Sequence, residues 1–146
     1  MKPTTIRGSA VVAERDARGV LDTCAYVDLA LIDPAGLPRT PELTAISLAE
    51  LHQGVGMAKD PVERARRTER LGDAVNAFPA PLPFGAEAAA RYGTLVALAL
   101  AGRRDPRPRK LDLMIAAIAS ANGLPLYTRN IKDFKGLESV LTVVAV

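Results

Sequence analysis

The stretch Leu111-Asp112-Leu113-Met114-Ile115-Ala116-Ala117-Ile118-Ala119 decides the fold, because one carboxylate opens a run that is otherwise apolar. Its alanines favour a helix over a strand, and Gly123 follows where a C′ glycine commonly ends a helix. A helix that is apolar on every side belongs in the interior of a protein. Asp112 would lie in the first turn, where the helix dipole favours a negative charge, so a helix start alone could explain it. A functional role for Asp112 therefore requires further carboxylates at the same place.

The composition is that of one globular domain with an aliphatic core. The chain has 146 residues, of which 49% are hydrophobic, and this excludes global disorder. Aromatic residues make up only 4% and tryptophan is absent, so a base-stacking platform for single-stranded nucleic acid is not expected. The net charge of +3 and the isoelectric point of about 9.3 permit a polyanionic partner.

Cysteine and histidine occur once each, as Cys24 and His52. A single cysteine can form neither a disulfide framework nor a cysteine zinc site, which fits a reducing, cytoplasmic setting. We expect Cys24 to be a small buried residue and His52 to be an ordinary polar or core histidine. A metal ion in this protein would therefore be a hard ion with oxygen ligands.

The beginning of the chain predicts neither a secretory signal nor a membrane anchor. Residues 1–18 are polar and weakly patterned, so we expect a partly disordered leader before one folded domain over residues 19–146. No run approaches the roughly 20 apolar residues that a membrane-spanning helix needs.

Strands and helices alternate along the predicted domain. Short strands are expected at residues 19–23, 43–46, 125–128 and 140–144, and helices at 25–31, from 47, at 61–77, at 86–101 and from 111. Asp60 and Pro61 are typical of a helix N-cap followed by proline, and Val62 and Val75 should face the core from that helix. The alternation predicts an α/β fold with a mainly parallel sheet, in which sites gather beyond the carboxyl ends of the strands.

Four acidic residues are expected at that edge of the sheet. Asp22 ends the first predicted strand, Glu50 lies in the helix after the second, Asp112 opens the central helix, and Asp133 follows the third strand. Each has a structural explanation by itself, since Asp22 and Asp133 could cap turns and Ser47 with Glu50 could form a capping box. Together they would repel one another, and Mg²⁺ or Mn²⁺ would offset that cost. A carboxylate-bound Mg²⁺ can activate water and stabilise charge on a phosphoryl group, which indicates phosphodiester hydrolysis.

A basic loop at residues 103–110 immediately precedes Asp112. Cations around an acidic centre could hold a polyanionic backbone, although a charged loop is more often simply solvated. The candidates are Arg103, Arg104, Arg107, Arg109 and, beside the last acidic segment, Arg129.

Four stretches of the sequence resemble the motifs of the PIN-domain family. They are VLDTC at residues 20–24, ISLAELHQGV at 46–55, LDLMIAA at 111–117 and LYTRNIKDF at 126–134. Their order and spacing agree with the family over residues 19–144, and within it the chain is similar to the VapC-type toxins of toxin–antitoxin pairs. The resemblance implies a PIN-like three-layer α/β/α fold with a mainly parallel sheet.

The resemblance also implies a Mg²⁺-dependent endoribonuclease, inhibited by a cognate VapB-like antitoxin and commonly a homodimer. Carried over by position, Asp22 and Asp112 would be the principal metal ligands. Glu50 would be the third acid, orienting metal-bound water or acting as a base. Asp133 or Asn130 would take the fourth position, since some members carry an acid where Asn130 stands. The five arginines would then hold the RNA strand.

Two other classes of protein fit part of the same pattern. A PIN-fold interaction protein would bind an antitoxin-like partner without turnover, and would cut no RNA when Mg²⁺ or Mn²⁺ is supplied. A phosphoacceptor receiver domain also has clustered carboxylates, but it needs adjacent acids near its first strand and a lysine at the end of its last. Asp22 has no acidic neighbour and Arg129 follows Thr128, so the receiver class is disfavoured.

Overall fold

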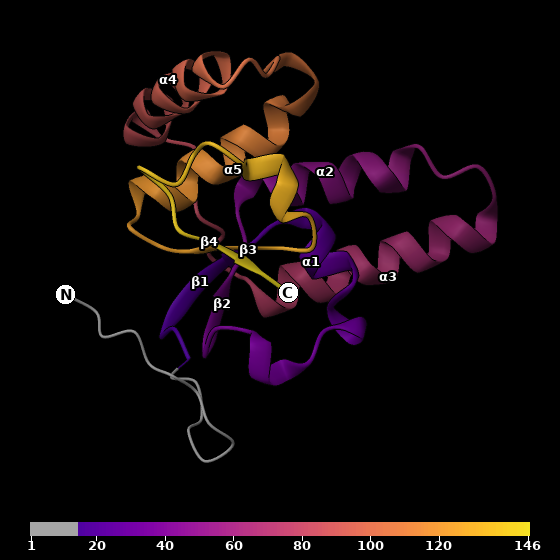
Figure 1. Ribbon diagram of the computed structural model, residues 1–146. Helices are drawn as coiled ribbons and strands as arrows, with labels where there is room; N and C mark the ends of the chain where they lie inside the picture. Colours follow the sequence, from indigo (N-terminus) through magenta and orange to yellow (C-terminus); the bar gives the residue numbers. More distant parts are fainter. Residues whose placement is uncertain (1–14) are drawn as a thin grey trace.

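Four parallel strands form the central sheet of the protein, which a computed structural model describes over residues 15–146. Their order across the sheet is β2-β1-β3-β4, so β1 and β3 lie in the middle (Figure 1). The strands are β1 (Arg18–Leu21), β2 (Thr40–Glu42), β3 (Leu126–Thr128) and β4 (Val143–Ala145). Because all of them run in the same direction, their carboxyl ends meet at one edge.

Helices cover both faces of this sheet, which confirms the predicted three-layer α/β/α fold. Figure 1 shows α4 and α5 above the strands and α3 below them, and α2 packs mainly along α3 while also contacting α5. The helices are α1 (Thr23–Val27), α2 (Ala45–Gly56), α3 (Pro61–Ala77), α4 (Ala86–Ala101) and α5 (Lys110–Ala121). Short 3₁₀ helices are η1 (Leu29–Leu31), η2 (Pro34–Gly36), η3 (Arg107–Arg109) and η4 (Ile131–Phe134).

The two middle strands are buried on both faces. Successive strand residues point to opposite sides, so Val20 and Leu126 join the core under α4 and α5, whereas Leu21 and Tyr127 join the core with α1 and α3. Burial on both faces is usual for parallel sheets that are covered by helices. Each large aliphatic side chain buried in this way contributes about 1.5–3 kcal/mol relative to an exposed one.

Helix α5 is the buried central helix that the sequence predicts. Leu113 and all residues from 115 to 120 are buried, and Asp112 lies in the first turn. The helix ends at the C-cap Asn122, and Gly123 follows with a φ of 64°. Glycine adopts this left-handed backbone without steric cost, which is why it ends the helix here.

The second strand and the start of α2 differ from the prediction. The strand is Thr40–Glu42 rather than residues 43–46, and α2 begins at Ala45. Thr44 is the N-cap, and its hydroxyl accepts a hydrogen bond from the Ser47 amide at 3.1 Å. The predicted capping box of Ser47 and Glu50 is therefore wrong, because a threonine three residues earlier already binds that amide.

Three further expectations are wrong, two about the bounds of elements and one about packing. Helix α1 ends at Val27 and continues as η1, and the last strand is Val143–Ala145 rather than 140–144. Asp60 does cap α3, with its carboxylate 2.8 Å from the Glu63 amide. Val62 and Val75 of this helix are 65% and 48% exposed, so neither faces the core as expected.

Residues 15–18, which the sequence analysis placed in the leader, contact the rest of the domain. Residues 1–14 lie outside the described residues. Arg15 donates hydrogen bonds to the carbonyls of Leu37 and Pro38, and the Asp16 carboxylate accepts one from the Tyr127 hydroxyl. The folded domain therefore includes residues 15–18. Within residues 15–146, no helix has the length and apolar character needed to cross a membrane.

Replacing Gly19 and replacing Gly72 by alanine should change the stability of the fold in opposite directions. A Cβ at Gly19 would overlap the Tyr127 ring inside the sheet, so we expect Gly19→Ala to destabilise the fold by about 1–3 kcal/mol. A Cβ at Gly72 in α3 would meet nothing within 4 Å, so Gly72→Ala should stabilise it by about 0.5–1 kcal/mol. Urea unfolding monitored by circular dichroism measures both, and a neutral Gly19→Ala would contradict the packing described for β1.

Candidate active site

Four acidic side chains from four separate elements lie at the carboxyl edge of the sheet. Asp22 follows β1, Glu50 is in α2, Asp112 is in the first turn of α5, and Asp133 is in η4. Three of them are close enough to Asp112 for their charges to raise its pKa, namely Glu50, Asp22 and Asp133. The tertiary structure thus brings together all the acids that the sequence analysis selected, while their catalytic roles stay predictions.

Asp22 is buried and works as the N-cap of α1. Its Oδ1 accepts a hydrogen bond from the Ala25 amide at 2.8 Å, and only 5% of the residue is exposed. Burial raises the pKa of this carboxyl, while hydrogen bonds from the Thr128 hydroxyl and the Ala25 amide lower it in part. The structural role and a metal-binding role are compatible, because a carboxylate has two oxygens and several lone pairs.

Glu50 is positioned by hydroxyl groups from two elements. Its Oε1 accepts a hydrogen bond from the Thr23 hydroxyl at 2.6 Å, and that hydroxyl lies 2.9 Å from the Ser47 hydroxyl. Thr23 directly follows Asp22, so this contact ties α2 to the end of β1. The sequence analysis missed Thr23, although its place beside Asp22 in the first motif was a usable signal.

Asp112 carries the largest perturbation among the acids. Burial, followed by the charges of Glu50, Asp22 and Asp133, raises its pKa from 3.8 to about 6, and Arg109 offsets part of this. The apolar run holds the start of α5 against the sheet, so the Asp112 carboxyl has little freedom to move away from the other acids. A raised pKa of this kind marks a functional-site candidate.

Asp133 is held by two protein donors. Its Oδ1 lies 2.6 Å from Nη1 of Arg109, and its Oδ2 accepts a hydrogen bond from the Asn130 side-chain amide at 2.7 Å. Asn130 and Asp133 were alternatives for the fourth position, and the structure joins them in one hydrogen-bonded unit.

The donor set fits a hard divalent ion in its chemistry. All four groups are carboxylates, and Asp112 shows that they already repel one another. Within the described residues, however, no three Asp, Glu, His or Cys side chains converge closely enough to hold an ion as they stand. Each of Asp22, Glu50 and Asp133 directs at least one carboxylate oxygen toward a protein donor.

A polar hollow opens beside Glu50 and Asp112. It has a volume of about 320 Å³ and is otherwise lined by residues 107–111. A larger hollow of about 620 Å³ lies between α1, η1 and α3, but its lining is mainly apolar and it contains none of the four acids. The smaller hollow is the better candidate for chemistry, because both Glu50 and Asp112 line it.

The basic residues selected for RNA binding have different surroundings. Arg104 donates to the carbonyls of Lys132 and Lys135, and Arg107 pairs with Asp105. Arg109 pairs with Asp133. Arg103 and Arg129 are exposed and make no ion pair with the rest of residues 15–146.

Cys24 is exposed, so its predicted burial is wrong. It lies beside the site, where partial burial and the charge of Asp22 raise the pKa of the thiol. His52 is exposed on α2, which fits an ordinary polar histidine.

Comparison with known proteins assigns the chain to a family. It is 34% identical over 131 residues to Ribonuclease VapC5 of Mycobacterium tuberculosis, which covers 87% of this chain and 93% of that protein. The chain belongs to the VapC family of PIN-domain toxins. This confirms the resemblance that the four sequence motifs indicated. No protein-family model matches the chain.

Several solved structures share this fold. The crystal structure of VapBC-5 from Mycobacterium tuberculosis matches with a TM-score of 0.78 and 30% identity, covering 89% of this chain and 99% of that one. FitAcB from Neisseria gonorrhoeae matches with a TM-score of 0.67 and 25% identity, covering 86% and 95%. VapBC2 from Rickettsia felis, solved with a promoter DNA fragment, has a TM-score of 0.67 at 21% identity, covers 88% and 98%, and supports the fold alone.

Asp112 should make the stability of the metal-free protein depend on pH. Because folding raises its pKa to about 6, the folded state holds the proton more tightly than the unfolded chain does. Stability is then lost as the pH rises from about 4 through about 6, by about 1 kcal/mol after discounting for solvent screening. We expect Asp112→Asn to raise the melting temperature at neutral pH and to leave it nearly unchanged at about pH 4.

Calorimetry in buffer with a chelator measures this difference. An equal gain at both pH values would show that the substitution acts through packing and not through the charge.

Proposed function

We propose that this VapC-family chain is a toxin ribonuclease whose activity depends on Mg²⁺ or Mn²⁺ held by Asp22 and Asp112, with Glu50 as the third acid. The observation that carries the proposal is the convergence of acids from separate elements on Asp112. The likeness to Ribonuclease VapC5 over most of both chains supports RNA as the substrate. A divalent ion bound there would lower the pKa of a water ligand and take up negative charge on the scissile phosphate.

The residues of the chain would position the reacting groups. Asp22 is fixed by its N-cap hydrogen bond, and Asp112 by the buried helix that it opens. Only Oε1 of Glu50 is used in the hydrogen bond from Thr23, so Oε2 is available to accept a proton from the attacking water. Thr23 and Ser47 would keep this carboxylate oriented toward the site.

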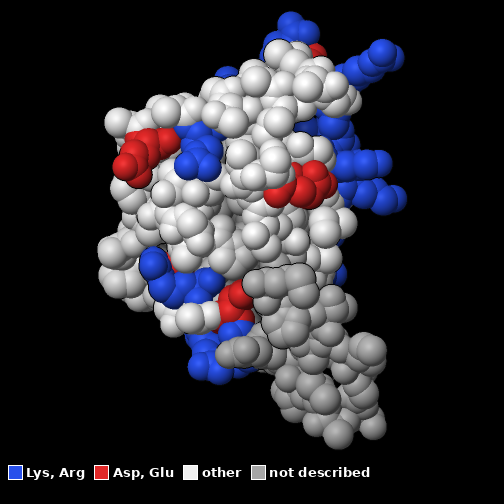
Figure 2. All heavy atoms as spheres, turned by 60° about the vertical axis from the view of Figure 1, so that its left-hand side comes forward, with Lys and Arg blue, Asp and Glu red and all other residues white. Residues whose placement is uncertain are grey.

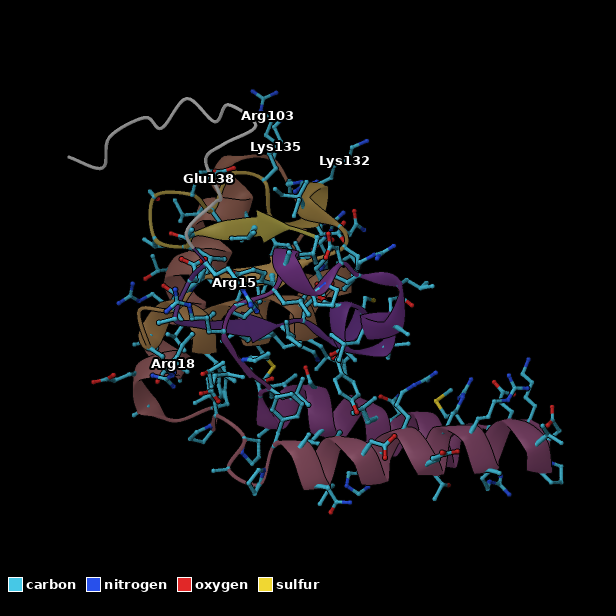
Figure 3. All side chains as sticks on the ribbon, turned by 90° about the horizontal axis from the view of Figure 1, so that it is seen from below. Arg15, Arg18, Arg103, Lys132, Lys135 and Glu138 are labelled. Atoms are coloured by element: carbon cyan, nitrogen blue, oxygen red, sulfur yellow. The ribbon has the colours of Figure 1, made fainter. Side chains whose placement is uncertain are left out.

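Exposed cations beside the site would hold the RNA backbone. Arg104 ties the loop after α4 to η4 through two backbone carbonyls, which places Arg103, Lys132 and Lys135 on one side of the molecule. Figure 3 shows Arg103 and Lys135 close together at one edge, with Lys132 further along it and Arg18 well away. We call Arg103, Lys132 and Lys135 the basic ridge, and η4, which bears Lys132 and is followed directly by Lys135, also carries Asp133.

The apolar hollow between α1, η1 and α3 would bind an antitoxin of VapB type. Its lining includes Tyr26, Val27, Leu29 and Phe78, and Leu31 in the same segment is 73% exposed. Apolar side chains that gather around one hollow are a feature that many protein interfaces share. The matching structures of VapBC-5 and of FitAcB support such a partner.

A homodimer would use a surface with little charge. Figure 2 shows a face whose middle is largely uncharged, with Lys and Arg mainly toward its margins. Helix α4 exposes Leu100 to 59% and also exposes several alanines, namely Ala86, Ala89, Ala90, Ala97 and Ala101. Small apolar residues along a helix favour close packing against a second copy of the chain.

Loss of either principal acid should abolish RNA cleavage. We expect Asp22→Asn and Asp112→Asn each to reduce Mn²⁺-dependent cleavage of a fluorescent RNA by at least about 100-fold, because both remove a proposed ligand. Asp73→Asn, which removes an exposed charge from α3, should cut like the wild type. Undiminished cleavage by the folded Asp22 and Asp112 variants would refute the mechanism, and no cleavage by any form would favour the non-catalytic interaction protein.

The basic ridge should contribute measurably to the salt dependence of RNA binding. In an Asp112→Asn background that cannot cut, replacing Arg103 and Lys135 by alanine should lower the slope of log K against log salt by about 1.4, since each phosphate contact on a single strand contributes about 0.7. Lys59→Ala with Arg66→Ala, in the turn between α2 and α3 and in α3 itself, is the control of equal charge. Equal slopes for the two double variants would exclude the ridge as an RNA contact.

A further inference from the structure

Arg109 is the one described cation that is paired directly with an acid of the site. Its guanidinium lies 2.6 Å from Oδ1 of Asp133, and the two side chains are only 33% and 26% exposed. The pair joins residues 24 positions apart, because the end of η3 lies beside η4. Asn130 binds the other oxygen of Asp133 at 2.7 Å, so both oxygens face protein donors.

This arrangement divides the acids into two kinds. Asp112 receives no hydrogen bond from residues 15–146, and the like charges of three other acids act on it. A bound cation would therefore be stabilised at this carboxylate. Asp133 already has a cation at bonding distance, the guanidinium of Arg109. Arg109 lies three residues before Asp112, directly ahead of α5, so the start of that helix holds it in place. Recruiting Asp133 to a metal ion would weaken or replace a charge-assisted bond that is partly shielded from water.

We propose that Arg109 is a built-in counter-ion that keeps Asp133 out of the metal's ligand set, and so weakens divalent-ion binding at Asp22 and Asp112. The inference rests on the proposed metal dependence. It makes Arg109 a positioning residue rather than a phosphate-binding arginine, in contrast to the role that the sequence analysis gave it. It also gives Asn130 a function, which is to hold the second oxygen of Asp133 in the same unit.

The direction of each expected change in Mn²⁺ affinity follows from the charge that the substitution leaves behind. Arg109→Gln leaves Asp133 unpaired and negative beside the site, so it should bind Mn²⁺ about tenfold more tightly than the wild type. Asp133→Asn leaves Arg109 unpaired and positive near Asp112, so it should bind about tenfold more weakly. The double variant Arg109→Gln, Asp133→Asn restores the local charge and should bind within about twofold of the wild type.

Isothermal titration of the metal-free, full-length protein with MnCl₂ measures these affinities without RNA. Arg109→Lys, which keeps the positive charge, should stay within about threefold of the wild type. Arg18→Gln is the matched control, since it breaks the Arg18–Glu42 ion pair at the opposite end of the sheet with the same change in net charge. Circular dichroism melts establish that each variant is folded before titration.

The Mn²⁺ affinities of the wild type, its variants and the control decide between the explanations. If Asp133 is itself a metal ligand in the wild type, Asp133→Asn and the double variant will both bind weakly, and the proposal is wrong. If Arg109→Gln binds Mn²⁺ no more tightly than Arg18→Gln, the ion pair is only structural and the proposal is wrong as well. A wild type that binds no Mn²⁺ at millimolar concentration would overturn the proposed metal dependence itself, a separate result from an unchanged Arg109→Gln.

Discussion

Repulsion between carboxylates at one edge of a parallel sheet is the constraint on which this structure depends. Parallel strands end at the same edge, so the acids that follow them or open the adjoining helices must meet there. In the absence of a cation this costs stability, and the repulsion adds to the burial that raises the pKa of Asp112. A fold that tolerates such a site needs strong packing elsewhere, and cations or donors that relieve part of the charge.

The packing is supplied mainly by α5. Its buried residues contact both the middle strands and α4, so the helix is held in place from Leu113 onward. Only the start of α5 reaches the edge of the sheet, and Asp112 is there. The same apolar run that makes the core thus also presents a charged group at the site, and moving the helix would require breaking the core.

The negative charge of the acids is offset to different degrees by their hydrogen-bond donors. Asp22 and Glu50 accept hydrogen bonds from an amide and a hydroxyl, which are neutral donors, whereas Asp133 accepts from a guanidinium. The charge therefore remains greatest around Asp112, where the polar hollow opens. In the proposed function, this remaining charge is the part of the site that would bind a metal ion.

The sequence by itself determined the elements that local physics controls. The apolar run of α5, the glycine that ends it and the Asp60 cap of α3 depend on neighbouring residues, and all were predicted correctly. The order of the four motifs also identified the family and the edge at which the acids meet. These features are expected in any fold that buries the same apolar segments.

Only the tertiary structure decided the partner of each side chain. Thr44 replaces Ser47 as the cap of α2, Glu50 binds Thr23, and Arg109 binds Asp133 rather than standing free for RNA. The exposure of Cys24 is likewise decided by where α1 lies against the site. Such contacts join residues far apart in the chain, and their geometry depends on how helices pack on the sheet, which periodicity and spacing do not encode.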